Sequence, residues 1–349
     1  MILPSTYLYS MILLVLSMLC WGSWANTYKL AGPKWRFELF YYDFAVGVLL
    51  ATLIAGFTFG SLGWDGFSFL DDIRNAGKRQ DLFAFLGGCV FNLANMLLVA
   101  AISLAGMAVA FPVCIGLALV IGTAWSYFLN PVGNPALLTG GCVCVLAAIA
   151  INSVAFKSHS TARLLNLAQQ GKTKSTKKSF NPKGLIIAVT GGVLMGSFYP
   201  LVEMARVSEI GLGPYGVAFV FAGGVLFSTF VYNLFFMNLP VQGNPVDFTE
   251  YFKGTGKGHL LGILGGMLWA AGAVTNFVAA RAEGAAQVGP AVSYAMGQGA
   301  TLISALWGLM YWKEFAGADS RVKTLLTTML VLFVVGLALV SVAPLYNAR

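Results

Sequence analysis

Ten apolar stretches, each close to twenty residues long, fill the chain from Pro4 to Pro344, and charged residues are almost confined to the gaps between them. The chain is 58% hydrophobic and only 10% charged, which is more apolar surface than a water-soluble domain of 349 residues can bury. A bilayer core about 30 Å thick calls for about 20 apolar residues per helix, because a helix satisfies its backbone hydrogen bonds internally. The sequence therefore predicts an all-α polytopic membrane protein.

The pattern predicts about ten transmembrane helices, with boundaries good to about 2–4 residues. The expected spans are 5–28, 37–60, 82–103, 107–129, 134–156, 184–206, 214–237, 259–280, 286–311 and 324–343. The first stretch has no basic segment before it and no convincing cleavage site, so we expect a retained helix rather than a signal peptide.

The two halves of the chain repeat one another. A shift of 178 residues places Gly87-Gly88 on Gly265-Gly266 and Pro112 on Pro290, and a shift of 177 places Phe44-Ala45 on Phe221-Ala222. We expect two five-helix repeats joined by a linker, covering 1–156, 157–183 and 184–349. An odd number of spans inverts the second copy in the membrane, and transporters built this way hold substrate near the midplane between the copies.

The linker between the repeats sets the expected orientation. It carries seven basic residues and no acid, which predicts a cytoplasmic loop and places both termini outside. Its Ser, Thr and Lys content is typical of a flexible linker. Gly171-Lys172-Thr173 resembles the end of a phosphate-binding loop, but that motif needs Gly where the chain has Asn166. A solvated loop is the simpler interpretation.

Polar side chains within the spans are the candidate substrate ligands, because they are costly in lipid and usually face a partner or a cavity. The ninth stretch has a polar stripe on one helical face that includes Tyr294 and Gln298. For each candidate the competing interpretation is packing between helices or, for Trp, anchoring at the membrane interface. The candidates are Trp21, Trp24, Asn26, Asn92, Asn95, Tyr199, Asn276, Tyr294 and Gln298.

Two acids within spans are candidates for ion coupling. Asp43 lies deep in the second stretch with no basic residue within a helical turn, and Val220 takes its place in the second repeat. Glu203 has Arg206 one turn away, so a plain ion pair competes with a coupling role. Glu38, close to Lys34 and Arg36, is expected at the interface.

Several classes of function are disfavoured. The basic residues sit in loops beside spans, where membrane topology explains them, so no nucleic-acid partner is expected. The five cysteines lie within apolar stretches without metal-ligand spacing, so no metal is expected. The two histidines lie outside the central parts of the spans and no catalytic motif is present, so we expect neither an enzyme nor a cofactor.

The chain resembles the drug/metabolite transporter superfamily in its ten spans, two halves and short third-to-fourth and eighth-to-ninth turns. Trp21-Gly22-Ser23-Trp24, followed by Lys29 and Gly32-Pro33, is similar to the glucose/ribose uptake porters. The basic linker and the segment from Asn92 through Asn95 and Gly106 to Ile121-Gly122 look more like the ureide permeases, which import allantoin, uracil and similar compounds. The resemblance implies a secondary importer whose central site is lined by the first, third, fourth, sixth, eighth and ninth helices.

We therefore expect a multi-pass protein of the cell membrane that imports a small, polar, mostly uncharged metabolite. A ureide or nucleobase and a monosaccharide are both open at this point, because Asn, Gln and Trp suit either. The expected partners are this small molecule, membrane lipid and a proton or sodium ion. A channel, which is a different class of transport protein from a carrier, is the alternative.

Overall fold

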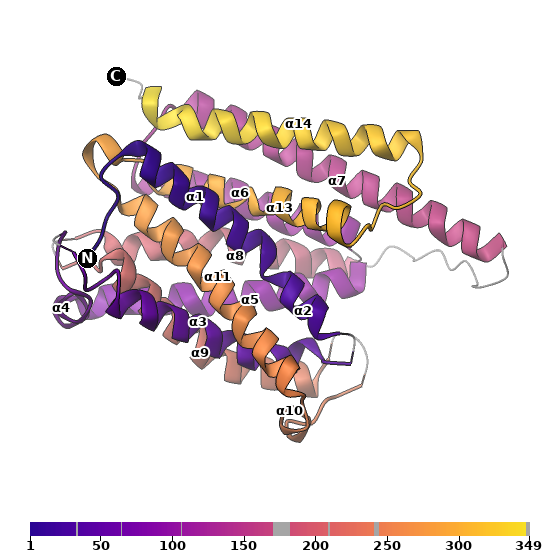
Figure 1. Cartoon of the computed structure of the whole chain (residues 1–349), viewed down its shortest axis with the longest axis horizontal. Coiled ribbons are helices and arrows are strands. Elements are labelled where there is room, and N and C mark those ends of the chain that lie inside the picture. Colours follow the sequence, from indigo (N-terminus) through magenta and orange to yellow (C-terminus); the bar gives the residue numbers. More distant parts are fainter. Residues whose placement is uncertain are drawn as a thin grey trace.

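The computed structural model describes residues 1–32, 34–63, 65–105, 107–169, 182–208, 210–240 and 244–346. These residues form long helices that run roughly alongside one another (Figure 1). The N-terminus and the end of α14 lie at one end of the bundle, which we call the termini face. The short helix α10 lies at the opposite end, which we call the α10 face.

The described residues of the first half form α1 (Tyr7–Ser23), α2 (Ala25–Ala31), α3 (Phe37–Phe57), α4 (Phe69–Asn75), α5 (Lys78–Ala105), α6 (Met107–Leu129) and α7 (Pro135–Gln169). The second half supplies α8 (Pro182–Arg206), α9 (Pro214–Asn238), α10 (Thr249–Phe252), α11 (Gly256–Arg281), α12 (Pro290–Gly297), α13 (Ala300–Leu306), the π-helical turn η2 (Trp307–Tyr311) and α14 (Ser320–Val342). Short 3₁₀ turns cover Gly284–Ala286 and Ala343–Tyr346. Thr6, Thr255 and Asp319 start their helices by accepting a backbone N–H.

Eight helical segments of the described residues are long and apolar enough to cross a membrane, so the chain is a multi-pass membrane protein. They are Tyr7–Ala31, Phe37–Phe57, Lys78–Ile102, Pro135–Leu165, Pro182–Arg206, Pro214–Asn238, Gly256–Arg281 and Ser320–Tyr346. The other two expected spans are also helical. The fourth contributes the shorter apolar segment Val113–Leu129, and the ninth is interrupted.

The interruption of the ninth span differs from the expected continuous helix over 286–311. The backbone tightens between α12 and α13, where Gly299 N–H donates to the Met296 carbonyl (2.9 Å) and Thr301 N–H to the Gln298 carbonyl (3.1 Å). Gly297 and Gly299 flank Gln298, and glycine is a poor helix former. A short 3₁₀ stretch inside a helix often marks a hinge.

The helix of the fifth expected span does not end at residue 156, because α7 continues to Gln169. The chain has no Gly or Pro between Gly141 and Gly171, so nothing ends the helix there. Residues 170–181 of the expected linker, with Gly171-Lys172-Thr173, lie outside the described residues, and α8 begins at Pro182.

The helices pack in pairs that join the two halves. α5 lies against α8 and α9, while α11 lies against α1 and α3. α7 and α14 pack along one side of the bundle (Figure 1). α3 and α11 are the most enclosed of the candidate spans. Of their apolar 18-residue segments, 61% and 67% are buried, against 33% for both α7 and α14.

Four glycines let these helices approach at backbone contact. A Cβ on Gly88 would collide with the Phe221 carbonyl, and one on Gly224 with the Phe85 carbonyl, so α5 and α9 touch through both. A Cβ on Gly47 would collide with the Ile263 carbonyl, and one on Gly266 with the Phe44 carbonyl, which joins α3 and α11 in the same way. Small residues allow such close approach in membranes, where packing drives helix association.

Candidate functional site

A polar group at the centre of the bundle is built around Asn276 of α11. Its Oδ1 accepts a hydrogen bond from the Tyr199 hydroxyl of α8 (2.5 Å). Its Nδ2 donates to the Ser293 carbonyl of α12 (3.0 Å) and to the Ser17 hydroxyl of α1 (3.3 Å). All four residues are fully buried, so one amide connects four helices drawn from both halves of the chain.

Tyr294 of α12 lies beside this group. Its ring centroid is 4.9 Å from that of Tyr199, and its hydroxyl donates to the Met195 carbonyl (3.2 Å). Gly122 of α6 leaves room for the ring, since a Cβ there would collide with it. The structure thus brings three predicted site residues together: Tyr199, Asn276 and Tyr294.

Trp21 of α1 adds an aromatic surface. Its indole N–H donates to the Trp269 carbonyl (3.0 Å), and the two rings stack with centroids 5.9 Å apart and planes at 19°. Trp269 also stacks on Phe221 and contacts Phe91. Gly297, the residue before Gln298, lies against the Trp21 ring. Trp21 of α1 is therefore packed against α11 and Gly297 of α12.

Gln298 lies where α12 ends, and its side chain is half-buried. No side-chain hydrogen bond links it to another residue in the described ranges. It is thus an amide at the midpoint of an interrupted helix with its donor and acceptor capacity unused.

The other predicted ligands engage neighbouring helices. Asn92 donates from Nδ2 to the Ser228 hydroxyl of α9 (2.8 Å), to Thr229 (3.1 Å) and to the Val225 carbonyl (3.2 Å). Asn95 donates to the Tyr41 hydroxyl of α3 (3.0 Å).

The segment around Trp24 holds the ninth span in place. Asn26 accepts from the Trp312 indole N–H (2.6 Å), and Ser23 accepts from the Trp307 indole N–H (2.8 Å). The Trp24 ring lies 4.9 Å from that of Phe44. The contacts of Asn26 and Trp24 are therefore contacts between helices.

Asp43 of α3 forms a second polar group, near the α10 face. Its Oδ1 accepts from the Tyr251 hydroxyl of α10 (2.6 Å), and its Oδ2 lies 2.9 Å from Nδ1 of His259 in α11. Asp43 is only 3% exposed. Burial, followed by the hydrogen bond to the Asp43 carboxylate, raises the pKa of Tyr251, so its hydroxyl stays protonated and donates at physiological pH.

Sequence reasoning missed His259 and Tyr251. They lie more than 200 residues from Asp43, and neither stands in a motif with it. Trp35 covers the same group, with its ring centroid 5.0 Å from that of His259. Only the packing of α11 on α3 creates this cluster.

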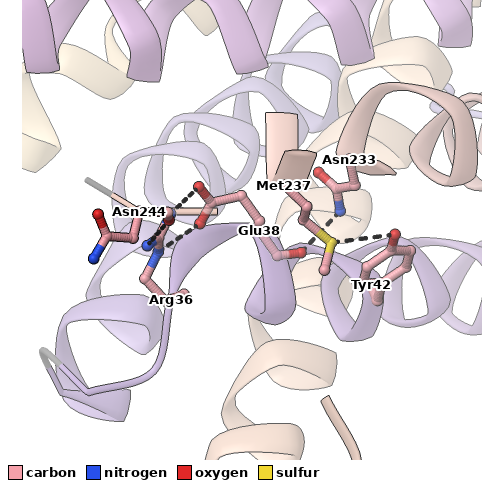
Figure 2. A network of polar contacts seen from close by, with 6 residues as sticks. All are labelled: Arg36, Glu38, Tyr42, Asn233, Met237 and Asn244. Atoms are coloured by element: carbon pink, nitrogen blue, oxygen red, sulfur yellow. Dashed lines mark hydrogen bonds and ion pairs between the residues drawn. The ribbon is translucent and has the colours of Figure 1, made fainter. Parts of the chain in front are cut away.

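The start of α3 is also tied to α9 and to the chain that follows it, as Figure 2 shows. Arg36 forms an ion pair with Glu38 (2.7 Å) and donates to the Asn244 carbonyl (3.1 Å). Asn233 of α9 donates to the Glu38 carbonyl (2.9 Å). With the Tyr251–Asp43 bond, these contacts hold the connection between α9 and α11 down on α3.

Comparison with known proteins identifies the family. The profile described as ureide permease matches residues 40–183 and 157–343, which together cover most of the chain. This chain belongs to the ureide permease family. It is 24% identical to ureide permease 1 of Arabidopsis thaliana, over 93% of this chain and 94% of the relative. It is 25% identical to ureide permease 5 of the same plant, with 93% and 92% covered, and 22% identical to probable ureide permease A3 of Vigna unguiculata, with 80% and 88% covered.

One solved crystal structure has the same fold. It aligns over 95% of this ureide permease family member and 95% of its own length, with a TM-score of 0.57 and 18% sequence identity. Both Arabidopsis relatives are named permeases. Within the described ranges, no three His, Cys, Asp or Glu side chains gather as metal ligands.

The remaining predicted acid, Glu203, lies at the end of α8 on the termini face. Its Oε2 is 3.3 Å from Nη1 of Arg206, and both side chains are about 95% buried. A cavity of about 370 Å³ opens beside them. The sequence predicted the ion pair, but it gave no sign of the cavity.

Proposed function

We propose that this ureide permease family member is a secondary active importer of small, polar, mostly uncharged metabolites, namely ureides or nucleobases. It works by alternating access between two inverted five-helix repeats and is coupled to protons through Asp43. The names of the relatives support the substrate class. We propose that both termini lie outside and that the 157–183 segment is cytoplasmic.

The observation that carries this proposal is the central amide group. Asn276 joins α1, α8, α11 and α12, and Gln298 lies at an interruption of the neighbouring helix with unused hydrogen-bonding capacity. Trp21 and Trp269 offer flat faces next to it. Interrupted helices at the midplane are typical of transporter binding sites. A planar ring with amide edges fits such a set of groups, and the absence of charge at this group favours a neutral substrate.

The glycine contacts support the inverted repeat. Gly88 meets Phe221 between α5 and α9, and Gly266 meets Phe44 between α11 and α3. The shift that superimposes Gly88 on Gly266 is one residue different from the shift that superimposes Phe44 on Phe221. Gly224 with Phe85 and Gly47 with Ile263 form the second matching pair. Each of these contacts between the halves therefore has a counterpart in which the two halves exchange roles.

The first test concerns substrate binding by Gln298. Uptake of labelled allantoin, uracil and glucose is measured in proteoliposomes with the unaltered chain, Gln298→Ala and the control Asn238→Ala, an exposed amide at the end of α9. Losing a hydrogen bond in a desolvated site costs about 1–3 kcal/mol, so the apparent affinity should fall roughly ten- to hundredfold. The control should be unchanged. An unchanged apparent affinity in Gln298→Ala would reject the proposed site. Saturable uptake of glucose alone would reject the proposed substrate class.

The second test concerns coupling. Asp43→Asn keeps the shape of the side chain but removes the ionisable group, so uphill accumulation driven by a pH gradient should be lost. Counterflow exchange should survive, because exchange needs no net movement of protons. Asp81→Asn, a change at the start of α5 on the termini face, is the matched control. Accumulation that persists in Asp43→Asn at normal folded yield would pass the coupling role to Glu203 or to another ion.

A further inference from the structure

The cavity on the termini face lies where four helices end. Its walls come from the ends of α6, α8 and α11 and from the turn that leads into α12. The lining residues are Asn130, Glu203, Arg206, Val207, Ser208, Ala280, Arg281, Ala282, Glu283 and Gln287. Its volume of about 370 Å³ falls within the range of small-molecule sites, about 300–1,000 Å³.

Two buried side chains in its wall have hydrogen-bonding atoms to spare. Oε2 of Glu203 and Nε and Nη1 of Arg206 are buried and have no hydrogen-bond partner in the part of the chain that the structure describes. The Glu203–Arg206 pair is close enough for attraction at 3.3 Å but makes no hydrogen bond. Buried charges that lack hydrogen bonds are costly, and a ligand that supplies both a donor and an acceptor would relieve that cost.

The charges of the wall cancel. Arg206 and Arg281 face Glu203 and Glu283, and Arg281 is paired with Glu283 at 2.7 Å. A cavity with this balance favours a neutral ligand over an anion or a cation. A ureide group suits it because its N–H can donate to a carboxylate while its carbonyl accepts from a guanidinium.

We propose that this cavity is a second, outer binding site for a neutral ureide, distinct from the central site. The site rests on the proposed transport of ureides. Glu203 accepts from the ligand N–H and Arg206 donates to its carbonyl, so Glu203 acts as a ligand and not as the coupling acid. The site lies on the path to the central group, since Glu203 is one helical turn from Tyr199 and Ala280 one turn from Asn276.

The test uses allantoin as the probe. A cysteine at the cavity wall, Ser208→Cys, is labelled with an impermeant maleimide in reconstituted full-length protein, with and without allantoin, and read by mass spectrometry at that position. Bound allantoin should slow labelling several-fold. The control is Arg74→Cys, an exposed position on the same face outside the cavity, whose labelling should not change.

A second arm separates the outer site from the central one. In Ser208→Cys combined with Gln298→Ala, protection of Cys at 208 should persist, although transport is impaired. In Ser208→Cys combined with Glu203→Gln and Arg206→Gln, protection should need roughly ten- to hundredfold more allantoin. Changing both charges together avoids leaving one of them buried and unpaired. Equilibrium binding should give two allantoin molecules per chain before and one after this double change.

The outcomes are distinguishable. Allantoin that is transported but never protects position 208 overturns the outer site and leaves the proposed function standing. If protection disappears with Gln298→Ala, allantoin in the central site is what shields position 208. That result also overturns the outer site. Allantoin that neither binds nor is transported removes both proposals. If the double charge variant does not fold, protection of position 208 with and without Gln298→Ala is enough to decide whether the outer site exists.

Discussion

Asparagine amides carry both a donor and an acceptor, and the asparagines of this chain differ in how these are used. Asn276 uses both, toward three other helices. Asn92 places its nitrogen against α9, while its Oδ1 is buried without a partner among the described residues. Residue type and position in a span were enough to nominate both. Only the packing shows that Asn92 faces α9 while Asn276 faces the centre.

We predict that Asn92→Ala lowers stability without changing substrate affinity. The change removes hydrogen bonds to Val225, Ser228 and Thr229 of α9, and interhelical hydrogen bonds in membranes are worth about 0.6–2 kcal/mol. The thermal unfolding midpoint of the detergent-solubilised protein should fall, while the apparent affinity for allantoin stays constant. Asn238→Ala, at an exposed position, should shift neither value. A change in affinity with no change in unfolding would return Asn92 to the substrate site.

At the scale of helices, hydropathy located the eight long apolar helices, most of them to within a few residues of their ends, because lipid demands long apolar helices. It did not foresee where helices bend or continue. The turn at Trp24, between α1 and α2, is accompanied by side-chain hydrogen bonds: Asn26 and Thr27 donate to nearby carbonyls, and Ser304 donates to the Gly22 carbonyl (2.9 Å). The 3₁₀ tightening at Gln298 lies between Gly297 and Gly299. Hydropathy also did not predict the extension of α7 to Gln169, since a polar stretch of helix lacks the apolar pattern that marks a span.

Adjacent glycines in α9 offer a matched pair of substitutions. A Cβ at Gly224 would collide with the Phe85 backbone of α5, whereas a Cβ at Gly223 would meet nothing within 4 Å. Gly224→Ala should therefore force α9 and α5 apart and lower the unfolding midpoint. Gly223→Ala should leave it equal or raise it slightly, because Ala is a better helix former by up to about 1 kcal/mol. Equal loss in the two variants would mean that the close approach does not hold these helices together.

At the scale of the molecule, the repeated sequence predicted two halves, and the glycine contacts occur at matching positions in them. The linker charge predicts that its face meets the cytoplasm, and this orientation stays a prediction. The cavity beside Glu203 could not be predicted, because it forms where the ends of four helices meet and no single segment encodes it. The same holds for the cluster of Asp43, Tyr251 and His259.

The proposed orientation is tested by labelling in intact cells. Single cysteines at position 74 and position 172 are treated with an impermeant maleimide. Position 74, exposed on the termini face, should react from outside, and position 172, in the basic linker, should react only after the cells are permeabilised. The reverse labelling pattern would show that the termini face lies in the cytoplasm, and it would contradict the proposed orientation.

The bond from Tyr251 to Asp43 fastens the α10 face of the bundle, and the second repeat has Val220 where the first has Asp43. In the proposed alternating-access cycle, that bond breaks before the α10 face opens, whereas the termini face already carries the cavity beside Glu203. The empty carrier should therefore open more slowly toward the α10 face than toward the termini face. We expect such kinetic rectification to appear as unequal half-saturation constants when transport is measured in the two directions across one membrane.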